Sequence, residues 1–384
     1  MNFVTTGGFG LLMPVLSVYL HSSLGASPAL IGLLFLITSV GGSASGPIGG
    51  ELCDKIGRRK VLVISSFIIT FGNIILAFAT IAYPSFLIFG ILYMALSLFR
   101  SWPRLVTETM VPDLISSERR LAIYGFLTAG SNAGWAIGAL LGGLLADSPS
   151  TIFFVAALFS FPLIFISLIV KESRPEEVEE KKKAMTALEF VKDALKTMID
   201  RVFLVFVGIA VLQSFVQGQF YQLFPIYAVE YVGITSQEMG ILYSLNGVTL
   251  ALFSTHVTKW VSRFNTITVY AMGAALFSIA CIGVGFTPSF IGIFLFYSVI
   301  EAFGEMLSNP SRSTLLADIA PVDKRGRYMG ILTLFQREIS SFGPLLGGFI
   351  MELFMSQFIL YWLFYAALGF ILILSTIALK RLVK

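Results

Sequence analysis

Long apolar runs recur along the whole chain and leave little room for anything else. They fall near 3–22, 29–50, 61–82, 84–108, 121–146 and 151–170, and again near 202–228, 238–257, 266–286, 289–312, 327–352 and 357–379. A helix of about 18 or more apolar residues is long enough to cross a bilayer. Only 12% of the 384 residues are charged, against roughly 25% in soluble domains. The pattern excludes a soluble fold and predicts an all-α membrane protein with twelve transmembrane helices.

The basic residues predict how these helices are oriented, because Lys and Arg in short loops stay in the cytoplasm. With the N-terminus inside, the inner loops receive Lys55, Arg58, Arg59, Lys60, Arg119, Arg120, Lys259, Arg263, Lys324, Arg325 and Arg327. The outer loops then contain no Lys or Arg at all. We therefore expect a multi-pass protein of the plasma or inner membrane with both termini in the cytoplasm.

One polar segment divides the runs six and six. Residues 171–201 carry eight basic and eight acidic residues, and we interpret them as a cytoplasmic linker with a surface helix near 186–199. The predicted domains are a six-helix bundle over 1–170 and a second over 202–384. The first run lacks a basic front and a small-residue cleavage site, so no signal peptide is expected. That run begins almost at Met1, which leaves open whether the natural chain starts earlier.

The two halves repeat each other. A shift of 205 residues places Asp113 on Asp318 and Gly138 on Gly343, and a shift of 208 places Gly32 on Gly240. The second shift also places Gly57 on Asn265, and Asn tolerates a left-handed turn better than most residues. The repeat predicts two pseudo-symmetric bundles, a design found in transporters that hold their substrate between two halves.

The loop after the second run carries the most specific motif. It reads GELCDKIGRRK over residues 50–60. Gly50 and Gly57 permit a close approach and a tight turn, and Asp54 can face a helix N-terminus or an Arg. The loop resembles the signature of the major facilitator superfamily at every specified position. That resemblance implies the major facilitator fold and a gate that joins Asp54, Arg58 and Arg59 to the inner ends of helices 4 and 11, with Glu108 or Asp113 as the acidic partner on helix 4.

Helix 5 contains a second family-like pattern. Its glycines resemble the antiporter motif of the superfamily, and they are Gly125, Gly134, Gly138, Gly142 and Gly143. One position departs from that motif, because Ala139 stands where the motif has proline. Helix 11 echoes them with Gly343, Pro344, Gly347 and Gly348. Small residues at this spacing also let helices pack closely in lipid. The segment 318–330 resembles a loop of multidrug exporters, whereas the usual helix 4 signature is absent, since its Arg position falls near Tyr93.

Several charged residues lie at membrane depth, where they are costly and mark functional sites by default. Arg100 on helix 4 and Glu305 on helix 10 each lie about 24 Å along their helix, and Glu301 lies about 18 Å along helix 10. Arg337 lies about 15 Å along helix 11. Arg104 and Arg312 are nearer the inner surface, and we interpret them as snorkelling or loop-pairing residues.

Polar residues at helical spacing extend these positions into faces. In the family that the chain resembles, helices 1, 4, 7 and 10 line a central cavity. The predicted substrate-cavity residues are Tyr93, Ser97, Gln213, Gln217, Tyr221, Tyr297 and Asn132.

The mechanism that we predict uses Glu301 or Glu305 as a proton carrier with Arg337 or Arg100 as the approaching cation. Burial favours the neutral form of a carboxyl and a nearby cation favours the charged form, so alternating access can couple proton release to substrate movement. A permanent ion network that holds the halves together is the structural alternative.

The function predicted from these features is proton-coupled efflux of small amphipathic compounds by a monomer, as in a multidrug antiporter. Uptake of a sugar or an organic anion stays open, as does a transporter-like solute receptor. An enzyme is not expected, because no nucleophile, phosphate loop or metal-ligand cluster is recognisable. Cys53, Cys281, His21 and His256 lie too far apart for a metal site. We expect no cofactor and no nucleic acid; the partners are lipid, protons and a small molecule.

Overall fold

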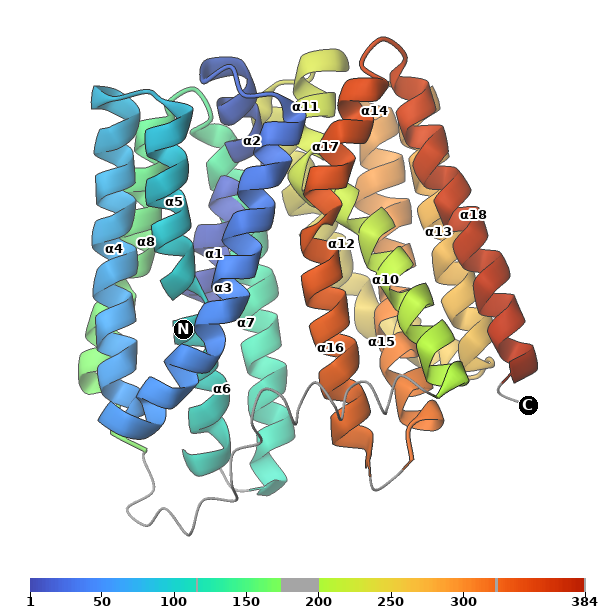
Figure 1. Ribbon diagram of the computed structural model, residues 1–384, viewed down its shortest axis with the longest axis horizontal. Coiled ribbons are helices and arrows are strands. Elements are labelled where there is room, and N and C mark those ends of the chain that lie inside the picture. Colours follow the sequence, from blue (N-terminus) through green and yellow to red (C-terminus); the bar gives the residue numbers. More distant parts are fainter. Residues whose placement is uncertain (115–116, 174–199, 322–323, 383–384) are drawn as a thin grey trace. The chain divides into compact units, whose positions relative to one another are not determined.

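The computed structural model describes residues 1–114, 117–173, 200–321 and 324–382, and within these ranges every regular element is a helix (Figure 1). The surface helix predicted near 186–199 lies outside the described residues. The side chains of Arg337 and Asp113 and the surroundings of Gly125, which the sequence predicts to be functional, also lie outside what the structure describes.

The first half of the chain supplies the helices that were predicted as runs one to six. They are α1 (Asn2–Leu12) with α2 (Leu16–Val18) and the π-helix η1 (Tyr19–Ser23), α3 (Pro28–Ile56), α4 (Arg58–Ala82), α5 (Phe86–Arg100) with α6 (Trp102–Leu114), α7 (Ser117–Leu144) and α8 (Pro149–Ile169).

The second half follows the same order. Its helices are α10 (Arg201–Gln222) with α11 (Phe224–Ile226) and η2 (Tyr227–Tyr231), α12 (Ser236–Val261), α13 (Thr266–Phe286), α14 (Phe290–Ile293) with η3 (Phe294–Glu301) and α15 (Ala302–Ile319), α16 (Arg325–Ser341) with α17 (Gly343–Leu353), and α18 (Phe358–Leu382).

In the part of the chain that the structure describes, nine helical segments are long and apolar enough to cross a membrane. The helices α7, α12 and α16–α17 cover the three remaining runs but are not among the nine. The all-helical membrane fold is therefore confirmed, while the number of twelve crossings stays a prediction.

Prolines place the breaks inside the composite helices. Numbered by the twelve predicted runs, helix 4 is interrupted at Ser101, between α5 and α6. Helix 7 is interrupted at Leu223, between α10 and α11, and helix 11 at Phe342, between α16 and α17. Pro103, Pro225 and Pro344 follow these breaks, and a proline ring clashes with the carbonyl four residues earlier. The breaks at Ser101 and Leu223 put Arg100 and Tyr221 at or near the end of an α-helical segment.

The repeat recurs in backbone detail. The π-helices η1 and η2 begin at Tyr19 and Tyr227, which are 208 residues apart. The turns after them use Gly25 and Gly233, both with positive φ (67° and 78°). This agreement between the halves in helix, turn and spacing supports the internal repeat.

At one repeated position our interpretation is wrong. Gly57 has φ 99° and separates α3 from α4, as its tight turn requires. Its mate Asn265 has φ −62° and is no left-handed residue. The Asn265 side chain instead caps α13 by accepting hydrogen bonds from the backbone N–H groups of Ile267 and Thr268, which is a favoured use of Asn.

By their contacts the residues form two compact units. The first comprises Met1–Glu177, Gln222–Ala251 and Pro344–Phe349, and the second comprises Val178–Tyr221, Leu252–Gly343 and Ile350–Lys384. These units do not follow the boundary predicted between 1–170 and 202–384, because the ends of helices 7, 8 and 11 pack with the first half. Whether the two six-helix halves are domains stays a prediction.

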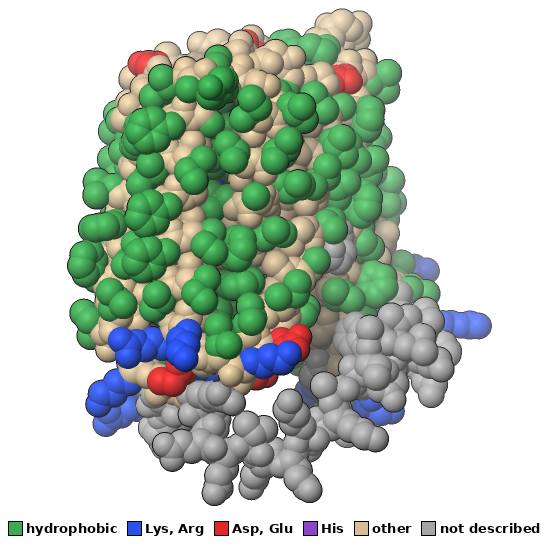
Figure 2. Space-filling view, turned by 60° about the vertical axis from the view of Figure 1, so that its left-hand side comes forward, with side chains coloured by type: hydrophobic (Ala, Val, Ile, Leu, Met, Phe, Trp, Pro, Cys, Tyr) green, Lys and Arg blue, Asp and Glu red, His purple; other side chains and the backbone are tan. Residues whose placement is uncertain are grey.

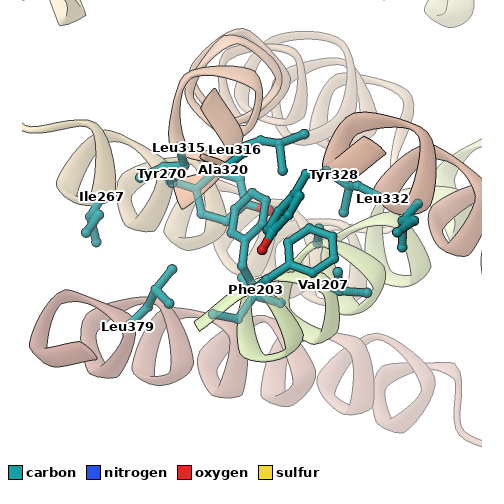
Figure 3. Packing of buried hydrophobic residues seen from close by; sticks show 14 of the residues in the cluster. Phe203, Val207, Ile267, Tyr270, Leu315, Leu316, Ala320, Tyr328, Leu332 and Leu379 are labelled. Carbon is teal, nitrogen blue, oxygen red and sulfur yellow. The ribbon is translucent and has the colours of Figure 1, made fainter. Parts of the chain in front are cut away.

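The second unit has a buried hydrophobic core around the start of α10 (Figure 3). Phe203 packs against Tyr328 of α16 with ring centroids 4.5 Å apart. The Tyr328 hydroxyl donates to Asp200 (3.0 Å), whose other carboxylate oxygen accepts from the N–H groups of Val202 and Phe203. Asp200 thereby caps α10 and ties it to α16.

The outside of the first unit is apolar, as lipid requires. Phe71, Phe78 and Leu158 are more than half exposed on α4 and α8. In Figure 2 apolar side chains cover the visible face, and Lys and Arg gather along its lower edge. This arrangement fits a surface that faces hydrocarbon and ends at a basic interface.

Candidate functional site

Glu305 is the centre of a polar cluster in the second unit. It lies one turn into α15, and its carboxylate accepts hydrogen bonds from the Tyr221 hydroxyl (3.0 Å) and from the Asn309 amide (3.0 Å). Gln217 lies within hydrogen-bonding reach of both Glu305 and Tyr221. Helices α10 and α15 thus bring together three of the predicted residues. The hydrogen-bond donors described around this carboxylate are neutral, and Arg312 on α15 is near enough to act on its charge.

Glu301 lies one turn earlier, at the end of η3. Its side chain is completely buried and lies close enough to Tyr221 and to the buried thiol of Cys281 in α13 to interact with both. A π-helical segment inside an α-helix is rare and often marks a functional site. The two carboxyls therefore share one irregular helix at membrane depth.

Gln213 continues the polar face of helix 7. It is 1% exposed, and neither atom of its amide has a hydrogen-bond partner within the described part of the chain. A buried amide without partners costs free energy, so this side chain has unused capacity to bind a polar group.

Arg100 occupies a separate site in the first unit, at the end of α5. Its guanidinium stacks over the Tyr93 ring at 4.7 Å from the centroid. It also donates to the Tyr93 hydroxyl (3.3 Å) and to the Asn73 side chain of α4 (3.4 Å). In the described part of the chain the hydrogen bonds of Arg100 and Glu305 go to neutral groups, and the permanent ion network stays the structural alternative. Arg337 lies outside the described side chains.

Three predicted cavity residues have other surroundings. Ser97 donates to the Thr38 and Met94 carbonyls and packs α5 against α3. Tyr297 is completely buried and stacks on Phe220, whereas Asn132 on α7 is exposed. Ser97 and Tyr297 belong to the interior of their units because helical spacing gives a face but does not identify the neighbour that covers it.

The loop motif contacts α6 and the end of α8. Arg58 donates to the Thr109 carbonyl (3.1 Å) and to Ser173 (3.2 Å), and Arg59 donates to the carbonyls of Ser167 and Leu168. Glu108, one expected acidic partner, pairs instead with Arg104 one turn earlier (2.8 Å). Asp54 is exposed.

The turn at Gly57 is completed by an acid that the motif does not contain. Glu172 accepts from the N–H groups of Arg58 (2.9 Å) and Arg59 (3.2 Å), which are the first residues of α4. The close approach expected at Gly50 is wrong for this structure, since nothing lies within 4 Å of the place where its Cβ would be.

Most of the antiporter-like glycines pack α7 against α1. A Cβ at Gly134, Gly138 or Gly142 would overlap the carbonyl oxygen of Phe3, Gly7 or Leu11, respectively. Gly143 is different, because its Cβ would lie 2.7 Å from the Cα of Gly240 in α12.

The contact of Gly143 has a counterpart within the same unit. Gly32 of α3 is covered by the backbone of Pro344 and Leu345, and Gly348 of α17 by the backbone of Pro28. Ser22 also donates a hydrogen bond to Glu230, its repeat mate 208 residues later. At the end opposite the basic loops, η1 thereby contacts η2, α3 contacts α17, and α7 contacts α12.

Two site residues were missed from the sequence. Asn73 is the one amide side chain of α4, and Asn309 follows Glu305 by four residues on one helical face. A search for every amide at membrane depth would have found both.

Comparison with known proteins agrees with this architecture. The family model described as Major Facilitator Superfamily matches residues 1–235 and 223–383. A Na(+), Li(+), K(+)/H(+) antiporter of Planococcus maritimus is 27% identical and aligns over 87% of this chain and 84% of its own length. The quinolone resistance protein NorA of Staphylococcus aureus is 24% identical, over 90% of this chain and 86% of its own length.

Solved structures show the same fold. A crystal structure of the nucleoside transporter NupG superposes with a TM-score of 0.81 at 15% identity and covers 98% of this chain and 97% of that one. A D-xylose–proton symporter superposes with a TM-score of 0.73 at 17% identity, covering 98% and 96%. At such identities the similarity concerns the fold alone.

Proposed function

The chain belongs to the major facilitator superfamily of membrane transporters, and from this premise we propose that it exports small amphipathic compounds in exchange for protons. The proposed topology has twelve crossings, both termini in the cytoplasm and the plasma or inner membrane as location, because all basic loop residues then lie inside. The chain works by alternating access and needs no cofactor beyond the proton gradient.

The observation that carries the coupling is the cluster around Glu305. A carboxyl at membrane depth is costly to keep charged, and here its oxygens accept hydrogen bonds from the neutral side chains of Tyr221 and Asn309, with Arg312 of the same helix near enough to act on its charge. Such a group can take up and release a proton as its surroundings change. Glu301, one turn away and completely buried, is the second candidate carrier.

The contacts at the end opposite the basic loops support alternating access. Gly143 with Gly240 and Gly32 with Pro344 bring helices of the two halves together backbone to backbone, and a side-chain hydrogen bond joins Ser22 to Glu230. In the proposed topology this end is outside, and we infer that these contacts close the first unit there. Opening must separate these contacts.

Two features support an amphipathic cargo. NorA, by its name, confers resistance to quinolones, and its similarity extends over nearly the whole chain. The buried amide of Gln213 and the side chain of Gln217 offer hydrogen bonds on the same helix as Tyr221, so a largely apolar molecule with a few polar groups fits this face.

A second candidate is exchange of alkali cations for protons. The groups around Glu305 present oxygen atoms from a carboxylate, a phenol and amides, and hard cations prefer oxygen ligands. The antiporter of Planococcus maritimus is a relative with that activity by name. Uptake of a sugar or an organic anion remains the third alternative.

Everted vesicles that pump protons inward separate these candidates. We expect norfloxacin or ethidium to dissipate the acid interior in vesicles with this protein and not in vesicles without it. Dissipation by NaCl or KCl alone supports the alkali-cation alternative. Solute counterflow of norfloxacin in proteoliposomes is the complementary test. No flux of any of these compounds, or flux only of D-xylose, would overturn the proposal.

A further inference from the structure

The first unit contains a cavity that the central site does not use. It has a volume of about 360 Å³ and lies between α1, α6 and α7. It is lined by Asn2, Thr6, Arg104, Glu108, Leu127, Thr128 and Ser131, and its accessible wall is about equally polar and apolar. This volume is within the range of cavities that hold drug-sized ligands.

The two charged residues of the cavity are accessible to solvent and pair with each other only in an exposed ion pair. Arg104 and Glu108 form an ion pair along α6 at 2.8 Å, and their side chains are 72% and 51% exposed. An ion pair so exposed contributes little to stability. A ligand can therefore open it and take both charges as its own partners.

Two of the remaining wall groups offer acceptors. The Asn2 side-chain oxygen is buried and has no hydrogen-bond partner in the described part of the chain. The Ser131 hydroxyl donates to the Leu127 carbonyl, so its lone pairs are left for a donor. The cavity thus offers the cationic guanidinium of Arg104 as a donor, and acceptors at Glu108, Asn2 and Ser131.

The cavity lies at the basic end of the unit. Thr109, next to Glu108 on α6, accepts a hydrogen bond from Arg58 of the loop motif. In the proposed topology this is the cytoplasmic end, where an exporter collects its cargo.

We propose that this cavity is a cytoplasmic loading site for zwitterionic amphiphiles, with the ligand carboxylate on Arg104 and the ligand ammonium group on Glu108 and Asn2. The assignment rests on the proposed export function and names its substrate class. A molecule with both charges replaces the ion pair by two charge-assisted contacts, whereas a molecule with one charge leaves Arg104 or Glu108 unpaired.

Three related probes test this directly. Norfloxacin carries a carboxylate and an ammonium group, its methyl ester lacks the carboxylate, and its N-acetyl derivative lacks the ammonium group. Binding is measured by calorimetry on the protein in nanodiscs at neutral pH. We expect Arg104→Gln to weaken norfloxacin binding roughly tenfold and to leave the ester unchanged. Glu108→Gln should weaken norfloxacin similarly and leave the N-acetyl derivative unchanged.

The other exposed ion pair provides a matched control. Lys55 pairs with Glu51 along α3 at 2.6 Å, with both side chains 65% exposed, and neither lines the cavity. Lys55→Gln should bind all three probes as the unmodified protein does. In transport, Arg104→Gln should raise the KM for norfloxacin without lowering the maximal rate.

The outcomes separate this inference from the proposed function. If norfloxacin is exported but both variants bind the three probes like the unmodified protein, the loading site is refuted and export stands. If no compound is exported, yet Arg104→Gln selectively weakens the binding of norfloxacin, the loading site stands and the proposed export function is refuted.

Discussion

Gly138 allows a sharp test of how α7 packs on α1. A Cβ at this position would overlap the carbonyl oxygen of Gly7, which is backbone and cannot swing away as a side chain can. Overpacking of this kind costs about 1–3 kcal/mol, and the better helix propensity of alanine returns about 1 kcal/mol. We therefore expect Gly138→Ala to destabilise the protein by up to about 2 kcal/mol.

The matched control is Gly8→Ala on α1, where nothing lies within 4 Å of the added Cβ. This variant gains the helix propensity without the clash, so its stability should stay equal or rise. Thermal unfolding of the purified protein in one detergent measures both, and Gly138→Ala should lower the Tm by a few degrees. Equal Tm values for the two variants would refute the packing role of Gly138.

Three further predictions concern closure, coupling and the loop motif. Gly143→Ala, and less strongly Ser22→Ala, should favour opening of the outer end. A cysteine introduced at the buried Ala228 should then react faster with a membrane-impermeant maleimide. Unchanged labelling in both variants would contradict this. Tyr221→Phe removes one hydrogen bond to Glu305 and should lower proton-driven transport roughly tenfold, with exchange retained; equal losses of both activities would indicate a structural defect instead. Glu172→Gln removes the negative charge at the start of α4 and should cost about 0.5–1 kcal/mol of stability, which a Tm equal to that of the unmodified protein would disprove.

The sequence predicts the membrane helices well because lipid imposes one strong rule on the chain. Spanning segments must be apolar and helical, so runs and loop charge can be read directly. The internal repeat is equally accessible, since Gly25 and Gly233 occupy the same turn in both halves.

Side-chain neighbours were predicted less well. The periodicity of helices 7 and 10 correctly groups Gln217 and Tyr221 with Glu305, because polar faces of adjacent helices meet. It assigns Ser97 to the cavity, although Ser97 packs against α3. Spacing determines which face a residue occupies, and the tilt and partner of the helix determine what covers that face.

Glycines show the same limit. Gly50 and Gly138 both belong to family-like motifs, yet only Gly138 meets another backbone. Likewise the Asn265 cap and the Glu172 cap depend on the exact start of a helix, and apolar runs do not define helix ends to one residue.

The central claim is that a buried carboxyl of helix 10 couples proton movement to transport. The most direct measurement compares proton-driven transport with energy-independent exchange in proteoliposomes that contain Glu305→Gln or Glu301→Gln. We predict that neutralising the carrier abolishes driven transport and leaves exchange intact, because a permanently neutral group cannot release a proton. Driven transport at the unmodified rate in both variants would contradict the account.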